Sequence, residues 1–199
     1  MKQSIGGYIV QLFLIVFSVV LGIFLSERIE ESKEQKEAMQ LLSRITSEVR
    51  ENQKLLQEWS PYHAEIAQSL DSLSINEQFI EHFIDDKSAL YEAVLTRGTF
   101  MGRMPSSDAW DIAKAHPLIV NFDYDQLLIL SKIYNQQQST FEPTDQLIEM
   151  FFSPDFNSSE KARPNLEQFR MRMQEIVGRE MQLLNYFIEA EGIFKFEDN

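Results

Sequence analysis

The first strong pattern along the chain is an uncharged apolar run over residues 5–25, IGGYIVQLFLIVFSVVLGIFL. As a helix this run is about 31 Å long, which matches the roughly 30 Å hydrocarbon core of a bilayer. A cleaved signal peptide usually has an apolar region of only about 7–15 residues followed by an Ala-x-Ala site. The run here is longer than that, and no Ala-x-Ala site follows it. The other alternative is a buried helix of a soluble domain. The run therefore predicts one uncleaved membrane-spanning helix.

This predicted span has one polar side. Gly7, Gln11, Ser18 and Gly22 follow one another at spacings that place them on the same face of a helix. Ser18 and Gly22 form a small-xxx-small pair, which lets a second helix come close, and Gln11 favours a hydrogen-bonding partner in hydrocarbon. Glycine and serine are also common in membrane helices that only meet lipid. Both interpretations stay open, and the four residues are the predicted membrane contact.

Beyond the span, the pattern predicts a helix that continues into water and then packs onto a domain. Residues 26–37, SERIEESKEQKE, are almost wholly polar and read as a helical connector. An apolar stripe follows, wider than the seam of a two-stranded coiled coil and interrupted by Glu48 and Asn52, so packing on the chain's own domain is favoured. Ser60–Pro61 is expected to end this helix. The stripe consists of Ala38, Leu41, Leu42, Ile45, Val49, Leu55, Leu56 and Trp59.

The next part of the chain predicts short helices with clear stops. Apolar residues place helices around residues 66–73, 79–84 and 90–95, followed by a connector over residues 98–105. Ser106 or Ser107 is expected to cap a helix that buries Trp110 together with Ala109 and Ile112, and Pro117 to end that helix.

The C-terminal part predicts longer helices. Asp123 and Gln126 form a capping box, a separate helix is expected after Pro143, and residues 153–159 are expected to be a loop. Alternating strand patterns are missing, so the prediction is an all-α protein. Its expected parts are a stub and anchor (1–25), a connector (26–37), a helical bundle (38–190) and a tail (191–199). The last amphipathic helix carries Leu166, Phe169, Met173, Ile176, Val177, Leu184, Phe187 and Ile188.

Composition narrows the possible partners. The chain has 199 residues, a formal net charge of −13 and no cysteine. An acidic surface repels phosphate, which argues against nucleic acid as a partner, and the missing thiols exclude disulfides and thiolate metal sites. Several phenylalanines lie in or near loops, where they either pack under the loops or form a patch for another protein. They are Phe151, Phe152, Phe156, Phe194 and Phe196.

The sequence offers no strong constellation for catalysis, a cofactor or a metal. His63, His82 and His116 are far apart, and His82 with Asp85 or Asp86 reads more simply as a solvated helix end. The acid pairs Asp85–Asp86 and Asp123–Asp125 fit caps and solubilising charge better than acid–base chemistry. Four arginines near the last helix favour internal salt bridges over an anion site. They are Arg163, Arg170, Arg172 and Arg179.

Two segments of the chain resemble a family of small, single-pass bacterial membrane proteins to which no function is assigned. One is the span with its connector, GGYIVQLFLIVFSVVLGIFLSERIEESKEQKEAMQLLSRITSEVREN, and the other is MPSSDAWDIAKAHPLIVNFDYDQLLILSKIYNQQ. Together they cover somewhat under half the chain. Members of that family typically have a more basic segment before the span, whereas only Lys2 is present here. The resemblance implies a membrane anchor with an extracytoplasmic domain, and it implies no functional residues.

These observations predict a non-catalytic interaction protein, such as an accessory or scaffold subunit of a larger membrane complex, which contacts other subunits or a second copy of itself. The alternative is an extracytoplasmic ligand-sensing bundle, which would need a partner because only four residues precede the span. We expect the bacterial inner membrane, with the N-terminus cytoplasmic and the domain periplasmic. Lys2 favours this orientation, whereas Arg28, Lys33 and Lys36 after the span favour the opposite one.

Overall fold

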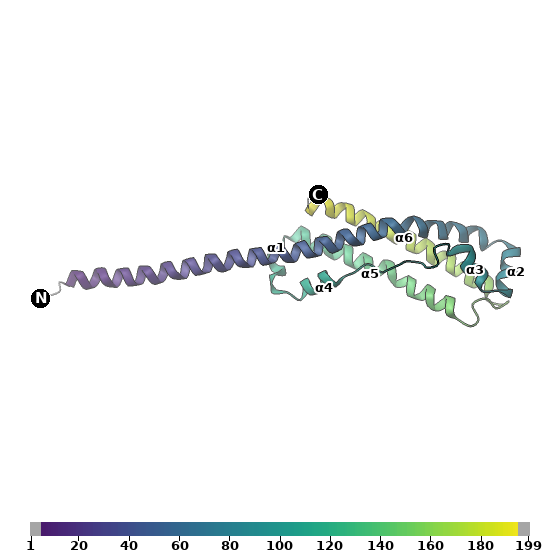
Figure 1. The fold of residues 1–199 in the computed structure, drawn as a ribbon, viewed down its shortest axis with the longest axis horizontal. Coiled ribbons are helices and arrows are strands. Elements are labelled where there is room, and N and C mark those ends of the chain that lie inside the picture. The colour runs from purple at the N-terminus through teal and green to yellow at the C-terminus, as the bar shows by residue number, and fades with distance from the viewer. Residues whose placement is uncertain (1–4, 195–199) are drawn as a thin grey trace.

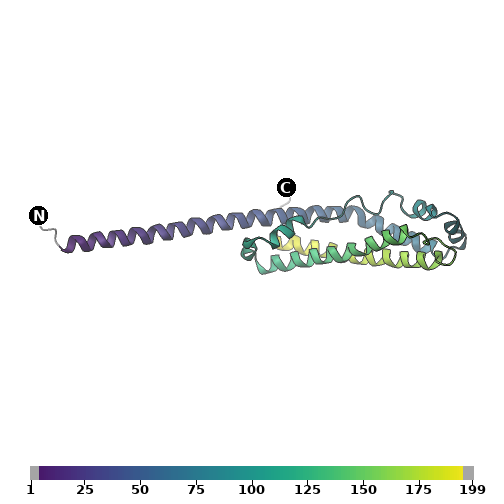
Figure 2. The same ribbon diagram turned by 90° about the horizontal axis from the view of Figure 1, so that it is seen from below.

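The computed structural model describes residues 5–194, and the side-chain environments of residues 5–7, 9 and 145 lie outside that description. The protein is all-α, as predicted. Helix α6 (Ala162–Phe194) packs along both α1 (Ile5–Leu73) and α5 (Tyr124–Phe152), and the three form the bundle in Figures 1 and 2. Shorter elements are α2 (Glu77–Asp85), α3 (Ser88–Val94), α4 (Asp108–Lys114) and the 3-10 helix η1 (Pro117–Asn121).

Helix α1 is one continuous element from the apolar N-terminal segment into the bundle (Figure 1). Its 69 residues correspond to a length of about 100 Å. The first part projects from the bundle, and its most apolar window has a mean hydropathy of 2.2 with no residue buried. By length and composition this helix could cross a membrane. The polar connector over residues 26–37 is helical, as expected.

The bundle contains two apolar clusters, one after the other along its long axis. The cluster nearer the apolar segment packs Ile45, Val49, Trp110 and Phe187 with their neighbours, and the farther cluster packs Phe83, Phe156, Phe169 and others. Helix α6 contributes to both, because its buried residues recur at alternating spacings of three and four. These residues are Ala162, Leu166, Phe169, Met173, Ile176, Glu180, Leu183, Phe187 and Ala190.

The expected helix end at Ser60–Pro61 is wrong, because α1 runs through Pro61 to Leu73. Proline removes one backbone donor, but Pro61 is exposed, so the carbonyl that loses its partner can bond to water. On either side of Pro61, Leu56 and Tyr62 are fully buried in the bundle. The packing of both halves of the helix outweighs the local preference of proline, and the predicted helix over residues 66–73 is the end of α1.

The expected break at Pro143 is also wrong, because α5 continues from Tyr124 to Phe152. In a helix the missing N–H of Pro143 would bond to the carbonyl of Ser139. Here Arg179 of α6 donates to that carbonyl instead, with an Nη1–O distance of 2.7 Å. A side chain distant in the sequence therefore replaces the lost backbone bond and allows proline inside a helix that is packed on α6.

Several other predictions are confirmed. The capping box of Asp123 and Gln126 opens α5, and helices lie near residues 79–84 and 90–95, as α2 and α3. Trp110 is buried, but Ile112 is 64% exposed, so the expected burial of Ile112 is wrong. Ile188 is 61% exposed and does not belong to the buried face of α6.

The phenylalanines near loops divide between burial and exposure. Phe156 is fully buried against Phe83 and Phe169, and Phe151 is half-buried beside it. Phe152 is 73% exposed, and Phe194 packs against the cluster nearer the apolar segment. Phe196 lies outside the described residues. Three of the four described members thus pack in or against the apolar clusters, so they do not form one exposed patch.

Replacing Trp110 by alanine should lower the free energy of unfolding by about 3–5 kcal/mol, because a large buried ring leaves a cavity. Urea unfolding of the detergent-solubilised chain would measure the change. Ile112→Ala, on the exposed side of the same short helix, is the matched control and should alter stability by less than about 0.5 kcal/mol. Equal effects of the two substitutions would contradict the packing of α4 described above.

Candidate functional site

The predicted membrane contact lies on the part of α1 that projects from the bundle. Gln11 and Ser18 are exposed, and a Cβ added to Gly22 would meet nothing within 4 Å. The Ser18 hydroxyl donates to the Leu14 carbonyl at 2.7 Å, so its hydrogen-bonding need is met within the helix. The backbone of Gly7 belongs to α1, but its surroundings lie outside the description. The face is open, and a partner for it stays a prediction.

A second group of polar residues lies inside the bundle, between the two apolar clusters. Each of the three long helices contributes to it, so it forms a polar layer across the bundle. Its members are Asn52, His63, Gln137, Thr140, Thr144 and Glu180, all buried. The part of the chain between α3 and α4, residues 95–107, is not helical; we call it the strap, and it lies along α1 with contacts to this layer.

Glu48 of α1 caps the start of α4. Its carboxylate accepts from the backbone N–H of Ala109 at 2.9 Å, the hydroxyl of Ser106 at 2.7 Å and the hydroxyl of Tyr134 at 2.6 Å. Ser107 occupies the N-cap position, but its hydroxyl donates to the Asp111 carboxylate at 2.9 Å and accepts no backbone N–H of the helix start. Of the two predicted caps, Ser107 does not cap through its side chain, whereas the Ser106 hydroxyl accepts from the Asp108 N–H at 3.1 Å. A negative charge at a helix start is favourable, so Glu48 joins three elements at one point.

The ring of Tyr134 lies against that of Trp110, with centroids 5.4 Å apart and planes 5° apart. Burial, then the hydrogen bond and charge of Glu48, raise the pKa of the Tyr134 hydroxyl well above its usual range. The hydroxyl therefore stays protonated and donates to Glu48. Tyr134 acts in this structure as a structural donor rather than as an acid or a nucleophile.

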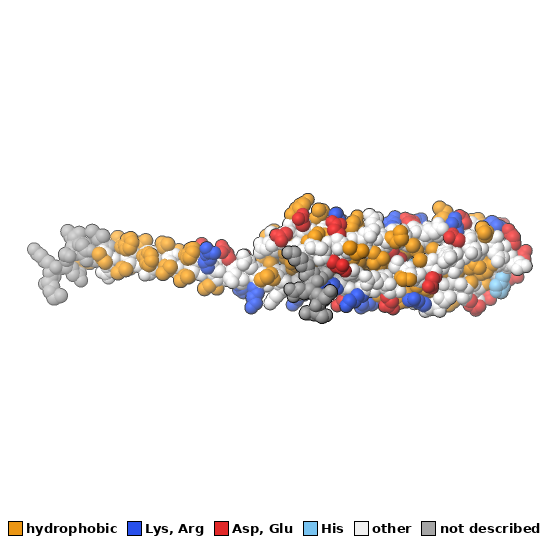
Figure 3. Space-filling model, turned by 90° about the horizontal axis from the view of Figure 1, so that it is seen from above, with side chains coloured by type: hydrophobic (Ala, Val, Ile, Leu, Met, Phe, Trp, Pro, Cys, Tyr) orange, Lys and Arg blue, Asp and Glu red, His pale blue; other side chains and the backbone are white. Residues whose placement is uncertain are grey.

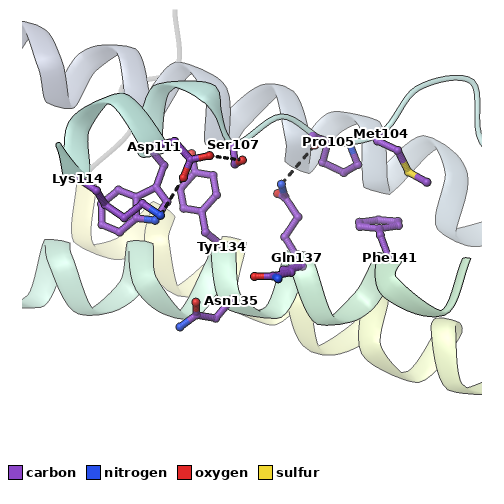
Figure 4. A pocket seen from close by; sticks show the side chains of 11 residues that line it. Met104, Pro105, Ser107, Asp111, Lys114, Tyr134, Asn135, Gln137 and Phe141 are labelled. Atoms are coloured by element: carbon purple, nitrogen blue, oxygen red, sulfur yellow. Dashed lines mark hydrogen bonds and ion pairs between the residues drawn. The ribbon is translucent and has the colours of Figure 1, made fainter. Parts of the chain in front are cut away.

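A groove of about 410 Å³ opens beside this pair, between the strap, α4 and α5 (Figure 4). Lys114 and Asp111 lie on its wall and pair with each other at 2.8 Å. Gln137 points across it and donates to the carbonyl of Pro105 (Figure 4). Its volume falls in the range of small-molecule sites, but the charged groups on its wall are already paired.

Asn52 holds the strap to α1 through both ends of its amide. Its Nδ2 donates to the carbonyl of Ser106 at 2.7 Å, and its Oδ1 accepts from the N–H of Ser106 at 3.0 Å. Nδ2 also donates to Gln137 of α5 at 3.1 Å. The Asn52 amide thereby satisfies both backbone groups of Ser106, as a neighbouring strand would. This pairing explains why a polar residue interrupts the apolar stripe of α1.

His63 and Glu180 form the most enclosed charged pair among the described residues. His63 Nδ1 lies 2.6 Å from Glu180 Oε1, and Nε2 lies 2.8 Å from the strap carbonyl of Phe100. The Phe100 carbonyl can only accept, so Nε2 carries a proton; when Glu180 is ionised, Nδ1 donates to it as well, which makes the ring an imidazolium paired with a carboxylate. The second oxygen of Glu180 is buried without a protein partner. The pair therefore ties α1, α6 and the strap together.

The pKa of His63 reflects opposing effects. Burial disfavours the charged ring, but the hydrogen bond and charge of Glu180, together with the carbonyl of Phe100, outweigh it and raise the pKa above the usual 6.5. Arg97 opposes this rise. Its guanidinium stacks over Tyr62 at 4.8 Å and Trp59 at 5.4 Å, which holds the first part of the strap on α1.

The other candidates from the sequence form structural contacts. Arg163 pairs with Glu77, Arg170 with Asp71 and Glu167, and both Arg172 and Arg179 with Glu175. The expected internal salt bridges are thus confirmed. Within residues 5–194, no three histidine or carboxylate side chains gather as metal ligands, and His82 is exposed at the end of α2.

The chemistry available to these groups is limited by their partners. Both nitrogens of His63 are engaged, and the cavity beside it, lined by Thr144, Met173 and neighbours, holds about 10 Å³. That volume is close to the space of one water molecule. The polar layer is therefore built to hold the helices and the strap in register.

Sequence reasoning missed the roles of Glu48, Asn52, His63 and Glu180. The signal that could have found them is the presence of polar residues at positions where the apolar period of α1 and α6 predicts burial. Comparisons with protein-family models, with curated proteins and with solved structures found no match to this chain. The resemblance proposed from two segments therefore stays a prediction.

We predict that the His63–Glu180 pair makes stability depend on pH. A raised pKa in the folded state means that the pair's contribution is fully present below about pH 6.5 and is lost as pH rises through the folded pKa. The difference in unfolding free energy between the parent and His63→Gln, measured with urea from about pH 6 to about pH 9, should shrink as pH rises.

His82→Gln is the matched control, because His82 is exposed on α2. Its pH profile should follow that of the parent. A stability difference for His63→Gln that stays constant over this pH interval would mean that the ring is not held in its charged form.

Proposed function

We propose that this protein is a non-catalytic, membrane-anchored interaction protein, an accessory or scaffold subunit of a larger membrane complex. Its anchor is the apolar segment of α1, in the inner membrane of a bacterium with two membranes. In this proposal the N-terminus is cytoplasmic and the bundle is periplasmic. The membrane part carries the contact face, and the bundle is held by α1 at a set distance and rotation above it.

The continuity of α1 carries this proposal. A flexible linker would suit a tethered enzyme, which needs only to stay near the membrane, whereas a helix transmits the position of one end to the other. The polar groups of the bundle support the same conclusion, because Glu48, Asn52 and His63 are engaged in holding α1, α4 and the strap together. These polar groups hold the elements in position, and their hydrogen-bonding atoms are engaged in that role rather than in catalysis.

A ligand-sensing role is the second candidate, and the groove between the strap, α4 and α5 is the observation that favours it. A ligand there would contact Trp110 and Lys114 and could shift the strap against α1. We rank this role second because Lys114 and Asp111 neutralise each other, which leaves the groove without a free charge to select a ligand.

Replacing Ser18 and Gly22 by leucine should reduce the recovery of partner proteins without unfolding the bundle. The larger side chains hold a neighbouring helix away and remove the close packing on which association in lipid depends, while membrane insertion stays as favourable. The measurement is mild crosslinking in intact membranes, followed by mass spectrometry of the proteins that co-purify with each variant.

The control is a double variant with Val16→Leu and Val20→Leu, which adds bulk on the other side of the same segment. It should recover partners at the parental yield. If the Ser18→Leu, Gly22→Leu variant does so as well, the face meets lipid and association depends on the bundle.

Reporter fusions test the proposed orientation. A fusion at Asn199 to alkaline phosphatase should be active, because this enzyme needs the oxidising periplasm, and a fusion to a fluorescent protein that matures in the cytoplasm should be dark. The opposite pair of results would place the bundle in the cytoplasm, as the cations after the span favour. Proteolysis of spheroplasts provides an independent measurement.

A further inference from the structure

Because α1 is one helix, residues beyond the apolar segment can be assigned to the side on which Ser18 and Gly22 lie. Each residue of an α-helix is rotated by about 100° about the helix axis relative to the one before it. We count a residue up to Lys54 as lying on this side when its angle about the axis is within about 45° of that of Gly22. We call this side the outer face of α1. It includes Ser18, Gly22, Ile29, Lys36, Arg44 and Lys54, together with Ser26, Lys33, Gln40, Ser47 and Glu51, and all of these residues are exposed. The bundle packs on the opposite side, through Ile45, Val49 and Leu56.

The outer face has an apolar residue where the segment leaves the predicted membrane. Ile29 is 71% exposed, although it lies within the polar connector. An isolated exposed isoleucine is ordinary on a protein surface. Figure 3 shows that charged side chains begin where the apolar segment ends. Ile29 follows the first of them, Glu27 and Arg28, so its position on the line of Ser18 and Gly22 extends the face beyond that point.

The cations on this face are unusual within the molecule. Most described lysines and arginines have an ion pair, a hydrogen bond or an aromatic ring as partner. Among residues 5–194, those with none are Arg103 of the strap and three residues of the outer face, Lys36, Arg44 and Lys54. In a chain with a net charge of −13, unpaired cations are thus concentrated on one side of one helix.

Acidic residues also lie on or beside this face, but no described carboxylate forms an ion pair with these three side chains. Lys33, also on this side, pairs with Glu37 at 3.8 Å, whereas Glu51 and Glu58, three residues before and four residues after Lys54, form no ion pair with it. Three cations therefore stay without carboxylate partners along about 27 Å of helix. A carboxylate of another molecule would provide each of them with an ion-pair partner.

We infer that the outer face of α1 docks one helix of a different membrane protein, whose own span continues out of the bilayer as a helix that carries acidic residues. This inference rests on the proposed function and specifies the chemistry of the partner. Within the membrane the contact is made over Ser18 and Gly22. Outside it, Ile29 contributes a small apolar contact, and Lys36, Arg44 and Lys54 face the acidic side chains.

Two other occupants fit the charges less well. A second copy of this chain, packed through the same face, would bring Lys36, Arg44 and Lys54 close to the same cations of its neighbour. Anionic lipid attracts cations only within about a Debye length, roughly 10 Å. Lys54 lies about 40 Å along the helix from Leu25, so headgroups can reach at most the first part of the face.

Exposed ion pairs are individually weak, so anchoring of both helices in the same membrane has to strengthen their association. Two helices anchored in one bilayer are already restricted in position and orientation, which raises their effective concentration. A few charged contacts then select the partner and its register. The contact should weaken with added salt, because the pairs are open to solvent.

Site-specific photo-crosslinking in the full chain tests the position of the contact. A photoreactive side chain replaces Gln40 or Ser47, which lie on the outer face, and Glu31 in the connector serves as the control on the opposite side. We expect both outer-face positions to crosslink to one protein, through a peptide that follows a membrane span and is rich in Asp and Glu. Glu31 should give at most a tenth of that yield.

Charge reversal tests the chemistry. Lys36→Glu, Arg44→Glu and Lys54→Glu together should lower the yield of that crosslink about tenfold. The matched control reverses the same number of charges on the bundle, with Arg103→Glu, Lys114→Glu and Lys161→Glu, and should leave the yield unchanged. Replacing the acidic residues of the crosslinked peptide by lysine should then restore crosslinking to the reversed chain.

The outcomes separate this inference from the proposed function. Crosslinks from the outer face to a second copy, to lipid alone or to a peptide without acidic residues would overturn the inference. So would a charge-reversed chain that keeps its crosslink. If partner proteins co-purify but crosslink only through the bundle, the proposed function stands without this contact. If the parent chain recovers no partner at all, the proposed function fails as well.

Discussion

The structure depends on one helix that is never interrupted between the apolar segment and the far end of the bundle. Several elements are placed directly against α1: α6 packs along it, Glu48 caps α4 from it, and His63 holds the strap against it, while α5 packs on α6. These contacts lie on one side, which leaves the outer face without contacts to the rest of the described chain. The rotation of the bundle about the helix axis is therefore coupled to the rotation of the apolar segment.

The polar layer explains why the three long helices adopt one register. Two apolar clusters alone would tolerate small shifts of one helix along another, since apolar contacts are not directional. Glu180 must meet His63, and Asn52 must meet both Gln137 and the strap, or buried polar atoms lose their partners. An unsatisfied buried polar group costs about 1–3 kcal/mol, so a shift by one turn is disfavoured.

Sequence patterns predicted those features that depend on local periodicity or on neighbouring residues. The all-α fold, the capping box at Asp123 and the burial of Trp110 belong to this group. The predicted breaks at Pro61 and Pro143 failed because tertiary contacts compensate for proline, and the compensating Arg179 is distant in the sequence. The candidate face on the apolar segment was predicted from spacing alone, and its proposed extension beyond residue 25 uses the same spacing along the continuous helix α1.

Because α1 is continuous, a contact at the apolar segment would also affect the position of the bundle. If a neighbouring helix tilts the apolar segment, the bundle follows, because α1 contributes to both of its apolar clusters. Displacement at the far end then grows with distance along the helix, and α2 and α3 lie at the end farthest from the N-terminus (Figure 1). A small tilt at Gly22 would thus give a larger displacement at α2. This leverage needs neither a hinge nor a catalytic group, and it suits a subunit whose contribution is to position a domain.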